Sequence, residues 1–429
     1  MLSVAVLAAL VVPFQAQQTL SARASAPAAG ACANRIGLNV SGWSGANQEG
    51  DIVRHELDMF MKANPCITTF FRPIPSDYQK KIQTEFAGGD EPDVMYVSPD
   101  MTYNEGKGGK LLDLTPYLAK DGVSLSQYIQ PLLQEFKICN KVYGLPKDWN
   151  TLAVYYNKAI FDAKKIAYPS NDMTFDQFRA LAKQLTTPSS NAANTIYGTI
   201  LPADWGRLCV FMYAYGSNLL DPLTGKVLFN NAKAVSALDF YTGMQLVDHS
   251  STTPSTVGDG WQGDSFGKGK AAMLIEGGWL TPYLRSTYPK IKFGVAMIPS
   301  GPAGRAAPLF TNAWGVSVNT VKAGTDKAAV KLAEFLSGPV VQKYVTDIGF
   351  AMPTISSLAS DPAIKNHPEV ANIFIAGVYG KVGDFGSYDT VTYKALNDAI
   401  TSVLLGKSTP QQAIAAAAKY IQSQESSAP

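Results

Sequence analysis

The chain has 429 residues, of which 46% are hydrophobic and 16% charged, and its formal net charge is +2. This length exceeds what one hydrophobic core commonly supports, so we expect two or three domains. The near-neutral charge leaves no basic face, which argues against a protein that binds nucleic acid or an acidic membrane surface.

The N-terminal residues 1–31 predict an export signal followed by a tether. The run Leu2 to Val12 is apolar but too short to span a bilayer, and Ser21 to Ala31 is rich in Ala, Ser and Pro. No Lys or Arg precedes Arg23, so the positive start of a signal peptide is missing. The alternative interpretation is a disordered tail. An export signal would place the protein in the periplasm or on the outer face of the cytoplasmic membrane.

The next segment alternates strands and helices. Strand-like runs cover Ile36–Val40, Ile67–Arg72 and Asp93–Val97, and helical periodicity covers Asp51–Lys62. A second helix begins at the capping box Ser76-Asp77-Tyr78-Gln79 and stops at Gly88-Gly89. The β-α-β-α-β order predicts a parallel sheet flanked by helices.

A second unit of alternating strands and helices follows. Its first helix opens at another capping box, Thr174-Phe175-Asp176-Gln177, and the C-terminal portion is helical. Between them lie a helix around 234–244, a helix end running into a strand at 266–275, strands at 291–298 and 313–318, and a helix at 327–336.

The four cysteines, Cys32, Cys66, Cys139 and Cys209, show no Cys-x-x-Cys spacing, so a zinc site is not predicted. Cys32 and Cys66 each precede a strand, and neighbouring parallel strands would bring their sulfurs together. Such a bridge would stabilise the fold by roughly 3–4 kcal/mol. A lipid anchor on Cys32 is the competing interpretation. Cys139 and Cys209 are a second pair or buried thiols.

No enzyme motif is present, and we predict no catalytic residue, cofactor or metal site. The three histidines lack metal-ligand spacing. The Gly-x-Ser-x-Gly elbow of serine hydrolases and the phosphate-binding loop of nucleotide hydrolases are both missing.

The run from Val142 to Lys158 is the most informative segment. It places Asp148, Trp149 and Asn150 in a row after a Gly-Leu-Pro turn and before the β-rich Leu152–Tyr156. A carboxylate and an amide bond hydroxyls, and an indole offers a flat apolar face. This combination favours binding of a polyhydroxylated ligand.

Other indoles and polar residues also lie beside predicted strand ends, where ligands settle in open parallel sheets. Flat indoles there would cover the apolar face of a sugar ring, and carboxylates would bond vicinal hydroxyls. The candidate sugar-binding residues are Trp43, Asn47, Gln48, Asp100, Asp148, Trp149, Asn150, Trp205, Glu276, Trp279 and Trp314.

Several stretches of the chain, taken in their order along the sequence, resemble the maltose-binding-like branch of the extracellular solute-binding proteins, which serve ABC importers. The matching segments are Asp77–Gly89 with Pro92–Tyr96, Gly109–Leu114, Tyr143–Lys158, Thr174–Phe178, Phe266–Trp279 and Thr311–Ser317. The resemblance assigns Asp100 to the family's ligand acid, and Trp279 and Trp314 to its stacking positions.

The resemblance implies an α/β fold with two lobes, each a mainly parallel sheet flanked by helices. Lobe one would hold 32–140 plus 291–349, and lobe two 152–290 plus 357–429. The chain would cross between the lobes near 141–151, 300–312 and 350–356.

The implied function is capture of a carbohydrate by hinge closure, with delivery to the permease subunits of an importer. The many indoles favour a di- or oligosaccharide, and the protein is expected to be a monomer that binds no nucleic acid. Two alternatives stay open: a secreted glycoside hydrolase, which needs two carboxyls about 5–9.5 Å apart, and a cell-surface lectin.

Overall fold

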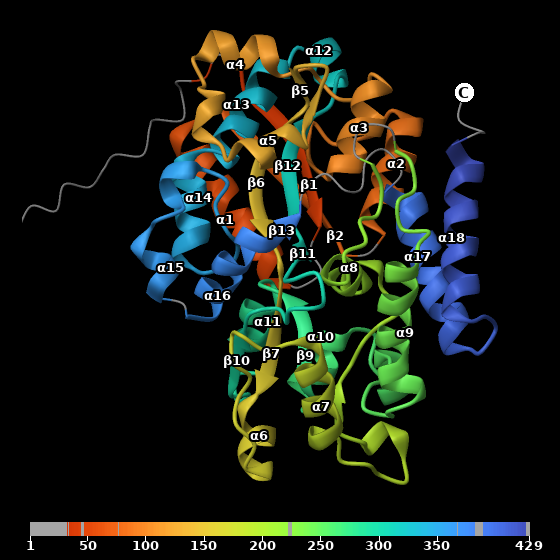
Figure 1. Cartoon of the computed structure of the whole chain (residues 1–429). Coiled ribbons are helices and arrows are strands. Elements are labelled where there is room, and N and C mark those ends of the chain that lie inside the picture. The colour runs from red at the N-terminus through yellow and green to blue at the C-terminus, as the bar shows by residue number, and fades with distance from the viewer. Residues whose placement is uncertain are drawn as a thin grey trace, which may run out of the picture.

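In the computed structural model, two lobes lie one above the other, each built on its own sheet (Figure 1). The structure describes residues 32, 34–43, 47–75, 77–221, 225–366, 368–381 and 389–425. The predicted export signal and tether therefore lie outside the described residues. Among the described residues, no helix is both long and apolar enough to cross a membrane.

Lobe one contains a five-stranded sheet in the order β2-β1-β3-β12-β6. Its strands are β1 (Ile36–Trp43), β2 (Ile67–Ile74), β3 (Val94–Val97), β6 (Gly144–Asn150) and β12 (Phe310–Val316). Its helices are α1 (Asn47–Ala63), α2 (Tyr78–Gly88), α3 (Pro99–Lys107), α4 (Thr115–Asp121), α5 (Gln130–Gln134), α12 (Asn319–Ala323), α13 (Asp326–Leu336) and α14 (Pro339–Asp347). A hairpin of β4 (Lys137–Ile138) and β5 (Lys141–Val142) lies beside it.

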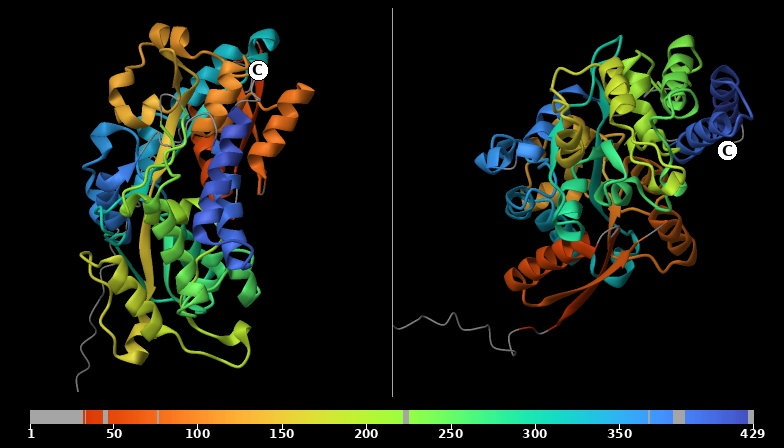
Figure 2. Two further views of the ribbon diagram at one scale, coloured as in Figure 1. Left: turned by 45° about the vertical axis from the view of Figure 1, so that its right-hand side comes forward. Right: turned by 90° about the horizontal axis from the view of Figure 1, so that it is seen from below.

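Lobe two contains a four-stranded sheet in the order β10-β7-β9-β8. Its strands are β7 (Leu152–Asn157), β8 (Tyr197–Thr199), β9 (Ala271–Gly277) and β10 (Phe293–Ala296). Its helices are α6 (Lys158–Lys164), α7 (Phe175–Leu185), α8 (Trp205–Ala214), α9 (Ala232–Leu246), α10 (Gln262–Gly267), α11 (Leu280–Thr287), α17 (Asp389–Leu404) and α18 (Pro410–Glu425). Figure 2 shows the hairpin of α17 and α18 against the side of the molecule, where α17 packs on α8 and both helices pack on α9.

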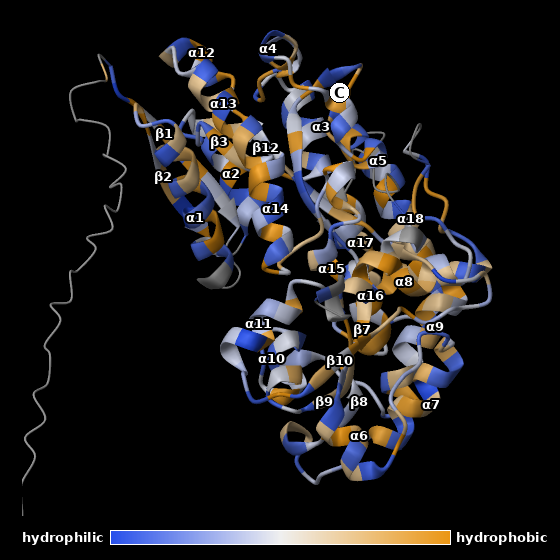
Figure 3. Cartoon of the chain, turned by 90° about the vertical axis from the view of Figure 1, so that its left-hand side faces the viewer, coloured by the Kyte–Doolittle hydropathy of each residue, from blue (hydrophilic) through white to orange (hydrophobic). Residues whose placement is uncertain are grey.

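Each lobe buries its own apolar core. In lobe one, β3 is buried along its whole length and packs with residues of α1, α2, β12 and α13. In lobe two, α8 is almost entirely buried, as a helix enclosed on all sides should be. Figure 3 shows α8 coloured largely as hydrophobic.

The predicted parallel sheet is only partly present. The pairings β1–β2 and β1–β3 are parallel, as the β-α-β order predicts. The lobe-one sheet is nevertheless mixed, because β12 pairs antiparallel with both β3 and β6. The expectation of a mainly parallel sheet is wrong for lobe two, because β7 pairs antiparallel with both β9 and β10 and only β8–β9 is parallel. β7 enters lobe two directly from β6 of lobe one and runs away from the lobe junction. β9 and β10 run back toward the junction, so both pair antiparallel with β7.

The lobe boundaries differ from the expected ones after residue 290. The segment 291–349 was expected in lobe one, but β10 pairs with β7, and Ile298 and Ala307 pack in the lobe-two core. Lobe one resumes only with β12. The short β11 (Ala307–Pro308) and β13 (Gly380–Lys381) pair at this junction.

The last expected crossing, near 350–356, is also displaced. Ile355 still bridges to Tyr128 of lobe one, and Leu358 packs against the lobe-one core. The chain then forms α15 (Pro362–Asn366) and α16 (Pro368–Ala376), and α16 packs against β7 and β10 of lobe two. The chain therefore leaves lobe one after residue 358.

The Cys32–Cys66 bridge is present, with a Cα–Cα distance of 5.5 Å. Parallel pairing of Ile36 with Ile67 brings the starts of β1 and β2 together, which is the geometry expected from the sequence. The bridge uses the Cys32 thiol that a lipid anchor would need. Cys139 and Cys209 do not pair with each other: Cys139 is exposed and Cys209 is buried.

Candidate functional site

Four aromatic rings gather where lobe two meets the start of β12. Trp205, the first residue of α8, stacks flat on Tyr393 of α17, with ring centroids 3.8 Å apart and planes 7° apart. Phe310, the first residue of β12, meets Trp205 edge-on at 5.9 Å and Trp279 at 5.5 Å. All four side chains are partly exposed. We call Trp205, Trp279, Phe310 and Tyr393 the aromatic cluster.

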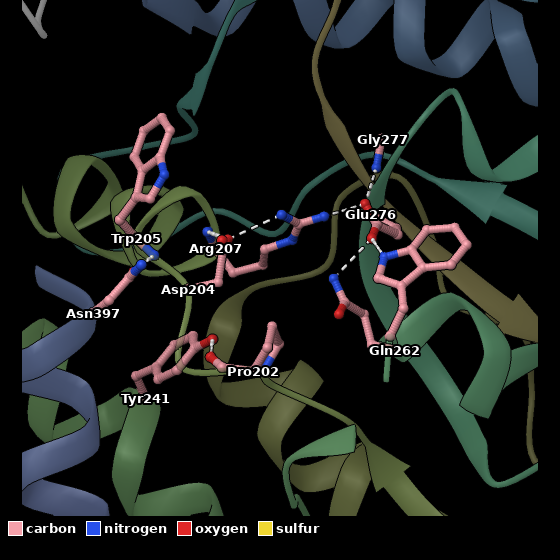
Figure 4. Close-up of polar contacts among 10 residues, drawn as sticks. Pro202, Asp204, Trp205, Arg207, Tyr241, Gln262, Glu276, Gly277 and Asn397 are labelled. Carbon is pink, nitrogen blue, oxygen red and sulfur yellow. Dashed lines mark hydrogen bonds and ion pairs between the residues drawn. The ribbon is translucent and has the colours of Figure 1, made fainter. Parts of the chain in front are cut away.

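A buried guanidinium joins the two segments that carry the tryptophans of this cluster (Figure 4). Arg207 Nη1 donates to Asp204 Oδ1 at 2.9 Å, and its Nη2 donates to Glu276. Asp204 also caps α8, accepting from the Arg207 backbone N–H at 3.1 Å. Burial opposes the charge on Arg207, but the carboxylates of Glu276 and Asp204 raise its pKa above the ordinary value. The charge therefore persists inside the lobe.

Glu276 is the other end of this network, and its side chain has 0% exposure. Its Oε1 accepts from Trp261 Nε1 at 3.0 Å and Gln262 Nε2 at 2.8 Å, and its Oε2 accepts from Arg207 and from Gly277 N. The expectation that Glu276 grips sugar hydroxyls does not fit this structure, because both oxygens are enclosed and already satisfied. Glu276 instead anchors the turn that leads to Trp279.

Two of the expected stacking tryptophans are interior residues. Trp314 has 0% exposure and packs edge-on against Tyr96, with centroids 4.5 Å apart, in the lobe-one core. Trp149 is 6% exposed, packs with Met352, and donates from Nε1 to Pro353 O at 3.0 Å. Neither offers a free face to a ligand. Trp314 stands on the interior strand β12 and Trp149 on the edge strand β6, and burying each large apolar ring stabilises the fold.

The expected polar ligands on lobe one are also engaged within the protein. Asp100 is 2% exposed and accepts from Gln79 Nε2 and Ser98 Oγ. The Asp148 carboxylate is paired with Lys147 Nζ. Both carboxylates therefore have partners within the protein in this arrangement, and their role as sugar ligands stays a prediction.

Asn150 connects the lobe crossing to the aromatic cluster. Its Oδ1 accepts from Gly278 N at 2.8 Å and Thr151 N at 3.1 Å, and in the sheet Asn150 pairs with Phe310. Gly278 directly precedes Trp279, and a Cβ on this glycine would lie 2.7 Å from Asn150 Oδ1. The amide thus holds the turn before Trp279 against the end of β6.

Trp43 ends β1 on lobe one and stays partly exposed, stacked on Tyr78 with centroids 4.8 Å apart. Residues 44–46 and the side chains of Asn47 and Gln48 lie outside the described part of the chain. Of the expected sugar-binding residues that the structure describes, Trp43, Trp205 and Trp279 keep exposed ring surface.

Sequence reasoning missed Arg207, Phe310 and Tyr393. The run Asp204-Trp205-Gly206-Arg207 carries an N-cap signal that could have drawn attention to Arg207. Phe310 and Tyr393 come from segments remote in sequence, and no local pattern points to them. Among the described residues, no cluster of His, Cys, Asp and Glu could hold a metal ion.

Comparison with known proteins identifies the family. Residues 57–372 match the model of the bacterial extracellular solute-binding proteins. The chain belongs to this family. Among curated proteins, it is 25% identical over 281 residues to a binding protein of Brucella abortus (strain 2308), covering 65% of this chain and 66% of that protein.

Two further relatives of this family member carry named ligands. A maltodextrin-binding protein of Bacillus subtilis (strain 168) is 26% identical over 356 residues, covering 73% of this chain and 77% of that protein. The solved ABC substrate-binding protein of Listeria monocytogenes in complex with cycloalternan superposes with a TM-score of 0.83 at 24% identity, covering 92% and 100% of the two chains. This likeness establishes the two-lobed solute-binding fold.

Proposed function

We propose that this protein captures a carbohydrate, a di- or oligosaccharide, between its two lobes and presents it to the permease subunits of an ABC importer. The observation that carries the proposal is the aromatic cluster, in which partly exposed Trp205 and Trp279 are held by a buried charge network at the lobe junction. Indole faces of this kind suit the apolar faces of sugar rings. The maltodextrin-binding relative supports the same ligand class.

Capture would work by hinge closure. The chain crosses between the lobes at Thr151, between β10 and β12, and after residue 358, so the lobes are joined by several short connections. A sugar that contacts both lobes only when they are closed shifts the population toward the closed form. The permease would recognise that form. The protein would act as an exported monomer.

Binding without catalysis fits the described carboxylates. A glycoside hydrolase needs two carboxyls facing one glycosidic bond. Asp100 and Glu276 are buried and hydrogen-bonded, and Asp148 is paired with Lys147. Incubation with labelled oligosaccharides checks this point, and product released at catalytic rates would overturn it.

Titration calorimetry tests the ligand class. A thermal-shift screen with glucose, maltose, trehalose, cellobiose and xylo-oligosaccharides selects the sugar, and calorimetry then gives its affinity. We expect at least one di- or oligosaccharide to bind with a Kd of about 1 μM or tighter, which corresponds to about 8 kcal/mol. If no saccharide binds while a non-sugar solute does, the carbohydrate assignment is wrong.

A further inference from the structure

Lobe one contains a small cavity beneath α1 that the proposed sugar site does not use. It leaves about 10 Å³ for the centre of a water molecule. Its polar lining comes from Glu56 of α1, Tyr96 of β3, Lys147 and Asp148 of β6, and Trp314 of β12. The rest of its lining is apolar. A space of this size holds about one water molecule.

Three buried polar atoms that belong to this lining make no hydrogen bond of normal length and angle to the described residues, although the Tyr96 hydroxyl interacts with the Glu49 carboxyl and lowers its pKa. They are Glu56 Oε2, the Tyr96 hydroxyl and Trp314 Nε1, in side chains that are 3%, 1% and 0% exposed. A buried polar group left without a hydrogen-bond partner destabilises the fold. The carboxylate oxygen of Glu56 accepts a hydrogen bond, the indole N–H of Trp314 donates one, and the Tyr96 hydroxyl can do both. A single water molecule can bond to all three kinds of group.

The cavity also carries more carboxyl groups than cations. Lys147 Nζ pairs with Asp148 and lies 4.5 Å from the Tyr96 ring centroid. Glu56 and Glu49, on the same face of α1, both interact with this pair. Burial raises the pKa of Glu56 to about 8 and that of Glu49 to about 7. Three carboxyls thus share one buried ammonium.

The other groups facing Glu56 do not balance this charge. Burial works against the Lys147 charge, but the surrounding carboxylates raise the pKa of Lys147 above its ordinary value, so its single charge is retained. Tyr344 of α14 interacts with Glu56, and its ring lies 4.7 Å from that of His55 on α1. From α13, only the apolar Leu336 lines the cavity. Fully ionised carboxyls would leave a net negative charge away from water, which is costly.

We propose that this cavity is a binding site for one water molecule and one proton, with the proton held by Glu56. The proton comes from solvent and leaves Asp148 paired with Lys147. The water bridges the Glu56 carboxyl, the Tyr96 hydroxyl and the Trp314 indole N–H.

The proton makes folding depend on pH with a definite sign. In the unfolded chain, Glu56 releases its proton near pH 4.5, whereas in the folded chain it does so near pH 8. The folded state therefore binds more protons between these values, and its stability falls as pH rises through this window. Each unit of pKa difference is a tenfold change in the folding equilibrium.

Glu56→Gln tests the proton, because it keeps the shape of the side chain and removes the titration. We expect the folding equilibrium constant of the wild type to fall as the pH rises from 5 to 9. Over the same range, the decrease in this constant should be smaller for the variant by a factor of at least about ten. Unfolding in urea at each pH gives both slopes. Equal slopes for the two proteins would overturn the proton site.

Tyr96→Phe tests the water, with Tyr103→Phe at a partly exposed surface tyrosine as the matched control. If a water bridges the Tyr96 hydroxyl, its removal lowers the folding equilibrium constant by about tenfold, whereas the control changes it little. A neutral or stabilising Tyr96→Phe would mean an empty cavity and refute the water site. A crystal structure of the unaltered protein gives a check independent of variant folding, since it must show a water bonded to all three atoms.

Discussion

Replacing Arg207 by Met should destabilise lobe two strongly, because it leaves Glu276 buried without its cation. Glu276 is 0% exposed, and Arg207 is only 12% exposed. Removing one partner of such a buried pair costs about 3–5 kcal/mol, although Trp261, Gln262 and Gly277 still donate to the carboxylate. For a unit of this size, the loss corresponds to a fall in Tm of roughly 6–20 °C.

A double-mutant cycle separates the pair from general damage. Glu276→Gln leaves Arg207 with Asp204, whose side chain is 29% exposed, so it should cost less than Arg207→Met. The double variant removes both charges, and its loss should be smaller than the sum of the single losses by about 2 kcal/mol or more. Thermal and urea unfolding followed by circular dichroism give the values.

The matched control is Arg54→Met. Arg54 Nη1 pairs with Asp51 at 2.8 Å, but the two side chains are 51% and 73% exposed. An exposed pair of this kind contributes about 0–1 kcal/mol, so the control should unfold near the wild-type temperature. Equal effects of Arg207→Met and Arg54→Met, or simple additivity in the cycle, would refute the idea of a buried network supporting the aromatic cluster.

Three further outcomes concern an exposed ring, a buried ring and the disulfide bridge. Trp279→Ala should leave the protein folded and weaken sugar binding at least about tenfold, as titration calorimetry would show; unchanged affinity would remove Trp279 from the site. Trp314→Ala should instead cost about 3–5 kcal/mol of stability, because this ring is fully buried; a variant with wild-type Tm would contradict that placement. Cys66→Ser opens a bridge with a sequence separation of 34 and should cost roughly 3–4 kcal/mol. Thermal unfolding with and without reductant checks this, since reductant should lower the wild-type Tm and leave the variant unchanged.

Local signals in the sequence predicted the early elements well. The capping box at Thr174 is formed as predicted, with Thr174 Oγ1 accepting from Gln177 N and Gln177 Oε1 accepting from Thr174 N. Gly89, with φ of 73°, ends α2 in a conformation that glycine adopts readily. The Cys32–Cys66 bridge is also present, as predicted from the two strand-like runs that follow these cysteines. These features depend on residues close in sequence or on one simple pairing.

The sequence could not show which way a strand faces or which lobe it joins. Trp279 and Trp314 have similar sequence surroundings, with strand-like residues and a neighbouring glycine. The ring of Trp279 is nevertheless partly exposed, whereas the ring of Trp314 is fully buried. The strand predicted at 291–298 is expected in lobe one, but β10 lies in lobe two, because the residues of a single short strand do not specify its partner. Tyr393 and Phe310 reach the aromatic cluster from distant segments, so only the folded chain brings them to Trp205.

The position of Phe310 gives the molecule an internal optical reporter. This residue begins a strand of the lobe-one sheet, yet its ring touches two indoles anchored in lobe two. A rotation that moves β12 relative to lobe two should therefore change the surroundings of those indoles. Intrinsic tryptophan emission should consequently register the rotation without an attached dye, and a stopped-flow recording of that emission would time the movement directly.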